Sequence, residues 1–350
     1  MTLIPIISSI NQGFNMKSDF NFTPLKGYEN FEATTQIIIA EILRRRLPFE
    51  IIDPDNNLIA VKYNNREYII HEGTISDANS LIAYWISNDK WMTKQFLSRS
   101  GIRHAKGTLL KAGDELEKAG LPPFPLVVKP FNTDHGIAVT AGITDGAQLV
   151  QALDRAFRHS GKVIVEEYFP GREYRFLVVD GVVRAVAYRD PANVTGDGEA
   201  TIRELIDWKN IGRGDDYRYP LLKIKVDEEV ERNLEELGLT LSSVPDKGQK
   251  VYLRKNSNLS TGGDSIDVTD TIADFYKKVA ARAAQAANLR LAGIDIIIRD
   301  PDAAPSEDGY IVVELNAPAM LSMHDFPWSG KNRNVEKYVL DCIFNIKSND

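Results

Sequence analysis

Apolar and polar residues follow two different periods along this chain, and together they predict a mixture of helices and strands. A helical period with cap-type residues at its start predicts helices in four segments: residues 33–47, 87–102, 145–161 and 275–288. Short β-rich runs bounded by Asn, Asp, Gly or Pro predict strands in further segments: residues 49–73, 124–132, 162–171 and 174–192.

The run over residues 174–192 predicts a hairpin, because two β-rich stretches meet at Asp180 and Gly181, a type I′ turn pair. Two further strands, "AGIDIIIRD" and "YIVVELNAP", follow the last long helix and are separated by the exposed loop "PDAAPSEDG". Hairpins mixed with helices indicate an α+β (mixed α/β) fold with subdomains around antiparallel sheets.

Composition narrows the class of protein. The 350 residues are enough for two or three structural units. The net charge of 42 − 49 = −7 disfavours a nucleic-acid-binding function. The single cysteine, Cys342, excludes a disulfide within the chain and predicts a cytoplasmic protein. We expect no signal peptide, because the apolar start "MTLIPIISSI" lacks a basic segment and a clear small-residue cleavage site. We expect no membrane partner, because no apolar run reaches the length of a membrane span.

Polar residues interrupt the last two strands. Glu314 and Asn316 lie two apart, so they share a face of their strand, and Asp295 lies in the strand before. If the strands are neighbours, the three side chains form an all-oxygen set that suits Mg²⁺ with substrate phosphates completing its shell. The residues alone leave a second interpretation open, in which both acids lie at strand ends, solvated or in salt bridges.

Lys129 ends the apolar run "PLVVKP", where a buried ammonium needs an anion such as a nucleotide phosphate. The alternative is a lysine on an edge strand with its amine in solvent. His135 and His324 are lone histidines and are assigned no proton-transfer role. The absence of GxSxG and of a partner for the cysteine argues against acyl-enzyme chemistry.

Several segments in collinear order over residues 30–345 resemble the ATP-grasp superfamily. The closest likeness is to the synthetase part of bifunctional bacterial glutathione synthetases, followed by the ATP-grasp domain of cyanophycin synthetases. The resemblance rests on these motifs: "SNDKWMTKQFLSRSGI", "LVVKP", "VIVEEYFPGREYRFLVVDG", "VYLRKNSNLSTGGDSIDVTD", "GIDIIIRD", "VVELNAPAM" and "MHDFPWSGKNR".

The resemblance implies an ATP-grasp fold with three parts and ATP bound between the last two. The parts are expected at residues 1–88 (N-terminal α/β domain), 89–160 (central lid subdomain) and 161–350 (C-terminal subdomain with the metal and substrate sites). It also implies ATP and Mg²⁺ as cofactors, with two metal ions and Mn²⁺ as a substitute, small-molecule acid and amine substrates, and a homo-oligomer.

Roles follow by position within the matching motifs. The nucleotide-binding residues implied are Lys90, Lys129, Glu166, Glu167, Tyr168, Phe169 and Glu173. The catalytic arginines implied are Arg175, Arg189 and Arg254. The substrate-binding residues implied are Asn256, Ser260, Thr261, Gly262 and Gly263. The metal ligands implied are Asp295, Glu314 and Asn316.

The activity implied is an ATP-dependent carboxylate–amine ligase that forms a peptide or amide bond through an acylphosphate, as glutathione synthetase does. Alternatives are another amino-acid or peptide ligase, of cyanophycin-synthetase-like or specialised-metabolite type, a phosphotransferase, and a non-catalytic nucleotide-binding protein. Two motifs depart from the superfamily: "TDHGIAV" has no GxG, and "NAPAM" lacks a glycine. No glutamate–cysteine ligase module or Mur-ligase module is expected in the chain.

Overall fold

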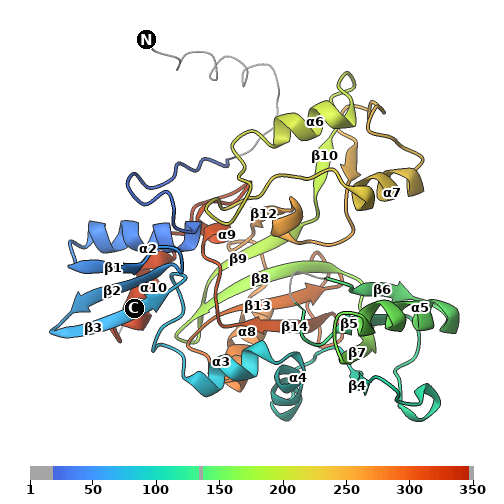
Figure 1. Cartoon of the computed structure of the whole chain (residues 1–350), viewed down its shortest axis with the longest axis horizontal. Coiled ribbons are helices and arrows are strands. Elements are labelled where there is room, and N and C mark those ends of the chain that lie inside the picture. Colours follow the sequence, from blue (N-terminus) through green and yellow to red (C-terminus); the bar gives the residue numbers. More distant parts are fainter. Residues whose placement is uncertain (1–18, 134–136, 347–350) are drawn as a thin grey trace.

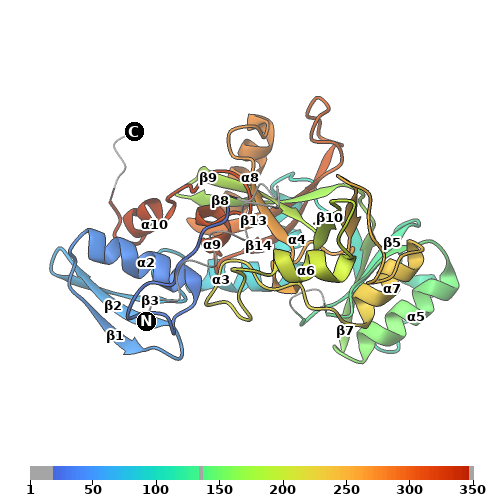
Figure 2. The same cartoon turned by 90° about the horizontal axis from the view of Figure 1, so that it is seen from above.

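The computed structural model describes residues 19–133 and 137–346, so His135 lies outside the described residues. Within these ranges the strands form sheets of three, four, five and two strands, and every strand pair is antiparallel. The three-stranded and four-stranded sheets lie at opposite ends of the five-stranded sheet (Figures 1 and 2). The predicted α+β class with antiparallel sheets is confirmed.

The N-terminal unit packs one long helix on a small sheet. Its elements are α2 (Ala33–Arg44), β1 (Phe49–Asp53), β2 (Leu58–Tyr63) and β3 (Arg66–His71). The sheet alternates as expected for one covered face, since Ile59, Val61 and Ile70 are buried against α2 while Ile69 is exposed. The helix and the strands predicted for residues 33–73 are therefore confirmed.

The five-stranded sheet forms the centre of the molecule, in the order β12-β9-β8-β13-β14. Its strands are β8 (Arg172–Val179), β9 (Val182–Asp190), β12 (Asp264–Asp267), β13 (Leu291–Ile298) and β14 (Tyr310–Asn316). The predicted hairpin is β8–β9, and positive φ angles at Asp180 and Gly181 (48° and 77°) fit its turn. The two late strands, β13 and β14, are neighbours, which meets the condition for Asp295, Glu314 and Asn316 to converge.

Both faces of the central sheet are covered. On one face Phe176 and Val178 pack against α3 (Leu81–Asn88), α4 (Lys90–Arg99) and α8 (Asp274–Ala286). On the other face Leu177 and Val179 pack against α2 and α10 (Glu336–Ile343). Because successive strand residues face opposite sides, apolar residues are needed at every position of β8 over this stretch.

The four-stranded sheet has the order β4-β7-β5-β6, with α5 (Gly146–Phe157) on one face. Its strands are β4 (Gly107–Lys111), β5 (Leu126–Pro130), β6 (Thr140–Ile143) and β7 (Lys162–Glu167). Leu126, Val128, Val163 and Val165 face α5 and are buried. The expected division ends the second part at residue 160, yet β7, which begins at Lys162, belongs to this sheet. The division into three parts stays a proposal.

The remaining elements lie around the far end of the central sheet. They are β10 (Asn193–Thr195), α6 (Ile202–Lys209), α7 (Glu228–Glu236), β11 (Lys250–Tyr252) and α9 (Ser322–Asp325), with a short 3-10 turn at Leu259–Thr261. A second 3-10 turn, Leu116–Lys118, packs instead with the four-stranded sheet. Thr201 caps α6 in a reciprocal arrangement with Glu204. None of the helices in the described ranges combines the length and the apolar character that a membrane crossing needs.

Candidate active site

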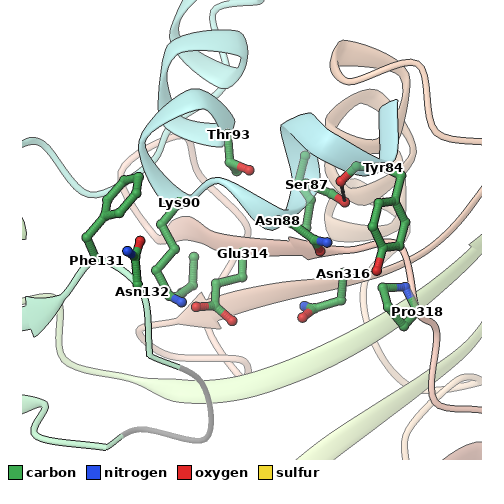
Figure 3. A pocket seen from close by; sticks show the side chains of 12 residues that line it. Tyr84, Ser87, Asn88, Lys90, Thr93, Phe131, Asn132, Glu314, Asn316 and Pro318 are labelled. Carbon is green, nitrogen blue, oxygen red and sulfur yellow. Dashed lines mark hydrogen bonds between the residues drawn. The ribbon is translucent and has the colours of Figure 1, made fainter. Parts of the chain in front are cut away.

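The two acids of the late strands lie directly opposite each other. Asp295 of β13 pairs in register with Glu314 of β14, and Gly293 pairs with Asn316. Tight antiparallel pairing therefore brings together the three side chains that the sequence singled out. Glu314 and Asn316 point into the same cavity, as their spacing on one strand requires (Figure 3).

This cavity has a volume of about 400 Å³ and lies between α3, α4, the loop after β5 and β14 (Figure 3). The side chains that line it are mostly polar: Tyr84, Ser87, Asn88, Lys90, Thr93, Phe131, Asn132, Glu314, Asn316 and Pro318. Lys90 is the first residue of α4, and its Nζ donates to the carbonyl of Thr133 at 2.7 Å. The cavity thus combines ammonium and carboxylate groups on facing walls.

Asp295 is almost fully buried and is held by two arginines. Arg175, opposite it on β8, donates through Nε and through Nη2 (2.9 Å), and Arg189 of β9 donates through Nη1 at 3.0 Å. Burial alone would raise the pKa of Asp295, but the two guanidinium groups lower it. A Cβ atom on Gly293 would lie 2.8 Å from Cδ of Arg175, so glycine leaves room for this arginine.

Glu314 differs from Asp295, because no side chain in the described part of the chain bonds its carboxylate. It is enclosed by protein on most sides and open to the cavity on one. Burial raises the pKa of Glu314, and the nearby Lys129 opposes the shift. A cation that enters the cavity would stabilise the ionised form of a carboxylate in this position.

The four-stranded sheet supplies a buried ion group on the face opposite α5. Lys129 of β5 and Glu166 of β7 lie diagonally across two paired strands, and Lys129 Nζ is 2.8 Å from Glu166 Oε1. Lys129 is only 7% exposed and lies on an inner strand, so the edge-strand alternative is excluded. Burial lowers its pKa, but attraction to Glu166 and Glu314 outweighs this and raises it.

The sequence reasoning missed Lys94, which also belongs to this ion group. Its Nζ lies 2.6 Å from Glu166 Oε2 and donates to the carbonyl of Ala105 at 2.8 Å. Lys94 follows Lys90 by four residues, so both lysines lie on one face of α4. That i, i+4 spacing in "DKWMTK" was the available signal.

The predicted nucleotide-binding residues that follow Glu166, namely Glu167, Tyr168 and Phe169, have mixed surroundings. Glu167 Oε1 accepts from the backbone N–H of Lys106, and Tyr168 N–H donates to the carbonyl of Pro125. Phe169 is buried, with the guanidinium groups of Arg103 and Arg299 over its ring. Only Glu166 of this segment therefore turns its side chain to the ion group.

Glu173 and Arg189 connect the central sheet to the loop before β12. Glu173 accepts from the hydroxyl of Ser257 and lies 3.3 Å from Nη1 of Arg189. Arg189 also donates to Oδ1 of Asn258 at 3.1 Å. Arg175, Arg189 and Glu173 thus form one network with Asp295.

Arg254 lies in a different place from the other two predicted arginines. Its guanidinium bonds to Asp227, the N-cap of α7, and to Glu229, one of three acids in the first turn that complement the helix dipole. Its predicted catalytic role has no support from these contacts and stays a prediction.

The predicted substrate-binding residues 256–263 are held by hydrogen bonds within their own loop and by contacts from residues 213–224. Asn256 Oδ1 accepts from Thr261 Oγ1 at 3.0 Å, and Ser260 bonds to the phenol of Tyr217. Gly262 has a φ of 96° and its backbone packs on Ile224, so a side chain would not fit there. The carbonyls of Gly262 and Gly263 accept from the buried Arg213.

Three comparisons agree with this architecture. The model of an ATP-grasp-like domain matches residues 29–82. The chain is 37% identical over 327 residues to the glutathione biosynthesis bifunctional protein GshAB of Clostridium perfringens, covering 92% of this chain and 42% of the relative. The GshAB of Enterococcus faecalis is 36% identical over 329 residues, covering 91% of this chain and 43% of the relative.

A solved structure, the bifunctional glutathione synthetase from Pasteurella multocida, superposes with a TM-score of 0.74 at 35% identity, covering 92% of this chain and 45% of that chain. The chain therefore has the ATP-grasp fold, as predicted. More narrowly, it is similar to the bifunctional glutathione synthetases, and it spans less than half the length of the curated relatives it matches.

Proposed function

We propose that the protein is an ATP-dependent ligase that joins a carboxylate to an amine through an acylphosphate. The observation that carries the proposal is the cavity in which Lys90, Glu314 and Asn316 face one another beside the buried Lys129–Glu166 pair (Figure 3). The ATP-grasp fold and the similarity to glutathione synthetases support it.

The residues fit a divalent cation of the hard type. Glu314 offers a carboxylate without a protein partner in the described ranges. Asn316 offers its amide oxygen, while its amide nitrogen donates to the carbonyl of Gly293 at 3.4 Å. Across the described ranges, no three His, Cys, Asp or Glu side chains group to hold a metal by themselves. The proposed set has two acids and an amide, and Asp295 joins it only by loosening its arginine contacts.

Mg²⁺, when bound, would offset phosphate charge and hold the nucleotide for transfer. This chain's own residues would do the remaining work. Lys90 and Lys129 would bind the phosphates, and Glu167 to Phe169 with Glu173 would hold the adenosine part, while the carboxylate of Glu166 is held by Lys94 and Lys129. Arg189 and Arg175 lie where they can stabilise negative charge on the transferred phosphoryl group and on the acyl oxygen.

The chemistry needs ATP because a free carboxylate is a poor acylating agent. The carboxylate oxygen attacks the γ-phosphorus, the bond to the β-phosphate oxygen breaks, and ADP leaves. The amine then attacks the acylphosphate carbonyl, phosphate leaves with its bonding electrons, and the amine loses a proton. A closed cavity keeps water from hydrolysing the acylphosphate.

We propose γ-glutamylcysteine and glycine as the first pair to test, because the relatives are named for glutathione biosynthesis. Phosphate release and mass spectrometry of the products, with ATP, MgCl₂ and pools of amino acids and dipeptides, test the function. Glutathione formation supports the narrow proposal. Another amide product would support the ligase function but with different substrates. A phosphorylated product without amide formation would indicate a phosphotransferase instead of a ligase. No substrate-stimulated ADP formation across the panel would overturn catalysis.

Homo-oligomer formation and a cytoplasmic location are further parts of the proposal. Size-exclusion chromatography with light scattering tests the first.

A further inference from the structure

Lys94 is a buried lysine to which neither the fold nor the proposed reaction gives a task. It is 3% exposed and lies one helical turn after Lys90 on α4. Burying an ammonium is costly unless anions or dipoles replace water. Here the Glu166 carboxylate and the Ala105 carbonyl do so, at 2.6 and 2.8 Å.

Glu166 is shared between two ammonium groups. Its Oε2 faces Lys94, and its Oε1 faces Lys129 at 2.8 Å. All three side chains are at most 8% exposed, so water screens these charges little. Burial raises the pKa of Glu166, but the two lysines outweigh burial and lower it, which keeps the carboxylate ionised.

The net charge of the ion group formed by Lys94, Glu166 and Lys129 follows from its three side chains. Burial, with Lys129, lowers the pKa of Lys94, while Glu166 opposes this shift. With both lysines protonated, two ammonium groups and one carboxylate leave one positive charge in excess. Lys94 has a second acceptor in the Ala105 carbonyl, whereas Lys129 has Glu166 alone among the described residues and is also attracted to Glu314 on the cavity wall. The unbalanced positive charge of the ion group therefore lies on the ammonium of Lys129, beside the cavity.

We infer that Lys94 is a positioning residue of the nucleotide site, which engages one oxygen of Glu166 so that Lys129 keeps a positive charge for phosphate. The inference rests on the proposed function. Without Lys94 the carboxylate pairs with Lys129 alone, and the group becomes neutral. Lys94 itself touches no nucleotide in this scheme and acts through Glu166.

The chain offers a matched control in Lys209. This lysine is 4% exposed and lies 2.6 Å from the buried Asp264, so its burial and its ion pair resemble those of Lys94. Its other donors go to the carbonyl and Oδ1 of Asn193. It does not line the cavity.

The test measures ADP and ATP affinity by calorimetry in MgCl₂, for the wild type, Lys94→Met, Lys94→Arg and Lys209→Met. We expect Lys94→Met to weaken nucleotide binding about tenfold, the effect of one poorly screened charge. Lys94→Arg keeps the charge and should stay within about threefold of the wild type. Lys209→Met should lower the melting temperature as Lys94→Met does, yet bind nucleotide like the wild type. In turnover assays Lys94→Met should raise the KM for ATP more than it lowers kcat.

A double variant separates positioning from plain structural support. Lys94→Met combined with Glu166→Gln removes the carboxylate as well, so Lys129 regains its uncancelled charge. The double variant should bind nucleotide more tightly than Lys94→Met alone. The double variant leaves Lys129 without its carboxylate partner, so its melting temperature is measured beside its affinity. Lys94→Gln, which removes the charge but keeps a donor toward the carbonyl of Ala105, should weaken binding as Lys94→Met does and keeps the test open if Lys94→Met fails to fold.

The outcomes are distinct. Wild-type affinity in Lys94→Met, or a double variant that binds no better than Lys94→Met, overturns the role of Lys94 and leaves the proposed function standing. A wild-type protein that binds neither ADP nor ATP overturns both.

Discussion

Two aspartates of the central sheet are buried to the same degree, and each is held by two cations, yet their surroundings differ. Asp264 on β12 is bound by Lys209 and Arg213, and Asp295 on β13 is bound by Arg175 and Arg189. Both side chains are 2% exposed. Burial and pairing are thus common to both clusters and do not by themselves mark a functional site.

The Asp264 cluster is closed. Arg213 also donates to the carbonyls of Leu222 and Gly262, and Lys209 donates to the carbonyl of Asn193. The ring of Trp328 lies against both cations, at 5.1 and 4.8 Å. Nearly every donor therefore ends on a group of the fold itself, which is the arrangement of a structural ion pair.

The Asp295 cluster is open on one side. Arg189 reaches toward Glu173 at 3.3 Å, and the register partner Glu314 faces a cavity without a protein partner among the described residues. The comparison shows that the site is identified by Glu314, whose carboxylate has no partner among the described residues, rather than by the paired Asp295. Four substitutions test this contrast.

The largest effect is expected for Glu314→Gln. Turnover should fall roughly 1,000-fold, because the substitution removes the open carboxylate proposed to bind the metal. The fold should survive, since Glu314 has no hydrogen bond to lose in the described ranges. Steady-state kinetics and thermal melting check this. Wild-type turnover would refute the metal assignment, and an unfolded variant would show that Glu314 is structural.

Asp264→Asn should show the opposite behaviour. Removing this charge leaves Lys209 and Arg213 buried without an anion, so we expect a loss of about 3 kcal/mol in the free energy of unfolding. ADP affinity of the folded fraction should not change, because the cluster does not line the cavity. Urea unfolding and calorimetry are the measurements. A stable variant with weakened nucleotide binding would reverse the contrast between the two clusters.

Arg189→Met removes one of the two guanidinium groups that bind Asp295 and so tests the Asp295 cluster. We expect kcat to fall about 100-fold, the usual effect of losing one group that stabilises transition-state charge. Asp295 keeps both contacts to Arg175, so stability should fall less than in Asp264→Asn. Rapid-quench kinetics with ATP would show the loss in the chemical step. An unchanged kcat with a raised KM would assign Arg189 to substrate binding.

The sequence predicts the centre of this site well because its signals are local. The apolar strands of Asp295 and Glu314 are consecutive in the chain, and consecutive strands commonly pair. Their register could not be predicted, because the loop over residues 299–309 and the bulge after Asp295 leave it open in the sequence. The Lys94–Glu166 contact was not predictable, because it joins a helix and a strand that are distant in the chain. The contact of Arg254 with α7 was also missed, since that helix has only two apolar residues, Val230 and Leu234, to signal its buried face.

Strands β4 and β6 were missed as well. They are short, of five and four residues, and lie at the two edges of their sheet, where one covered face gives little apolar signal. Helix α3 was missed because its run "LIAYWI" is apolar without a period, and its exposed residues Leu81, Ile82 and Trp85 hide the buried face.

The smallest effect concerns His324, which is buried behind the open cluster and faces Arg175, Asp267 and Asp295. Burial, with Arg175, lowers its pKa from 6.5 to about 3. The unfolded chain then takes up a proton at a higher pH than the folded one. Folding stability should therefore fall as pH drops from 6.5 toward 3, by at most roughly 1.4 kcal/mol per pH unit.

His324→Gln removes this titration and should flatten that part of the stability curve relative to the wild type. Urea unfolding at several pH values between 6.5 and 4 measures the difference, in which the carboxylates common to both proteins cancel. His159→Gln, at an exposed position on the four-stranded unit, is the control and should keep the wild-type slope. Equal slopes in all three proteins would mean that His324 is protonated in the folded state, with its charge balanced by Asp267 or Asp295.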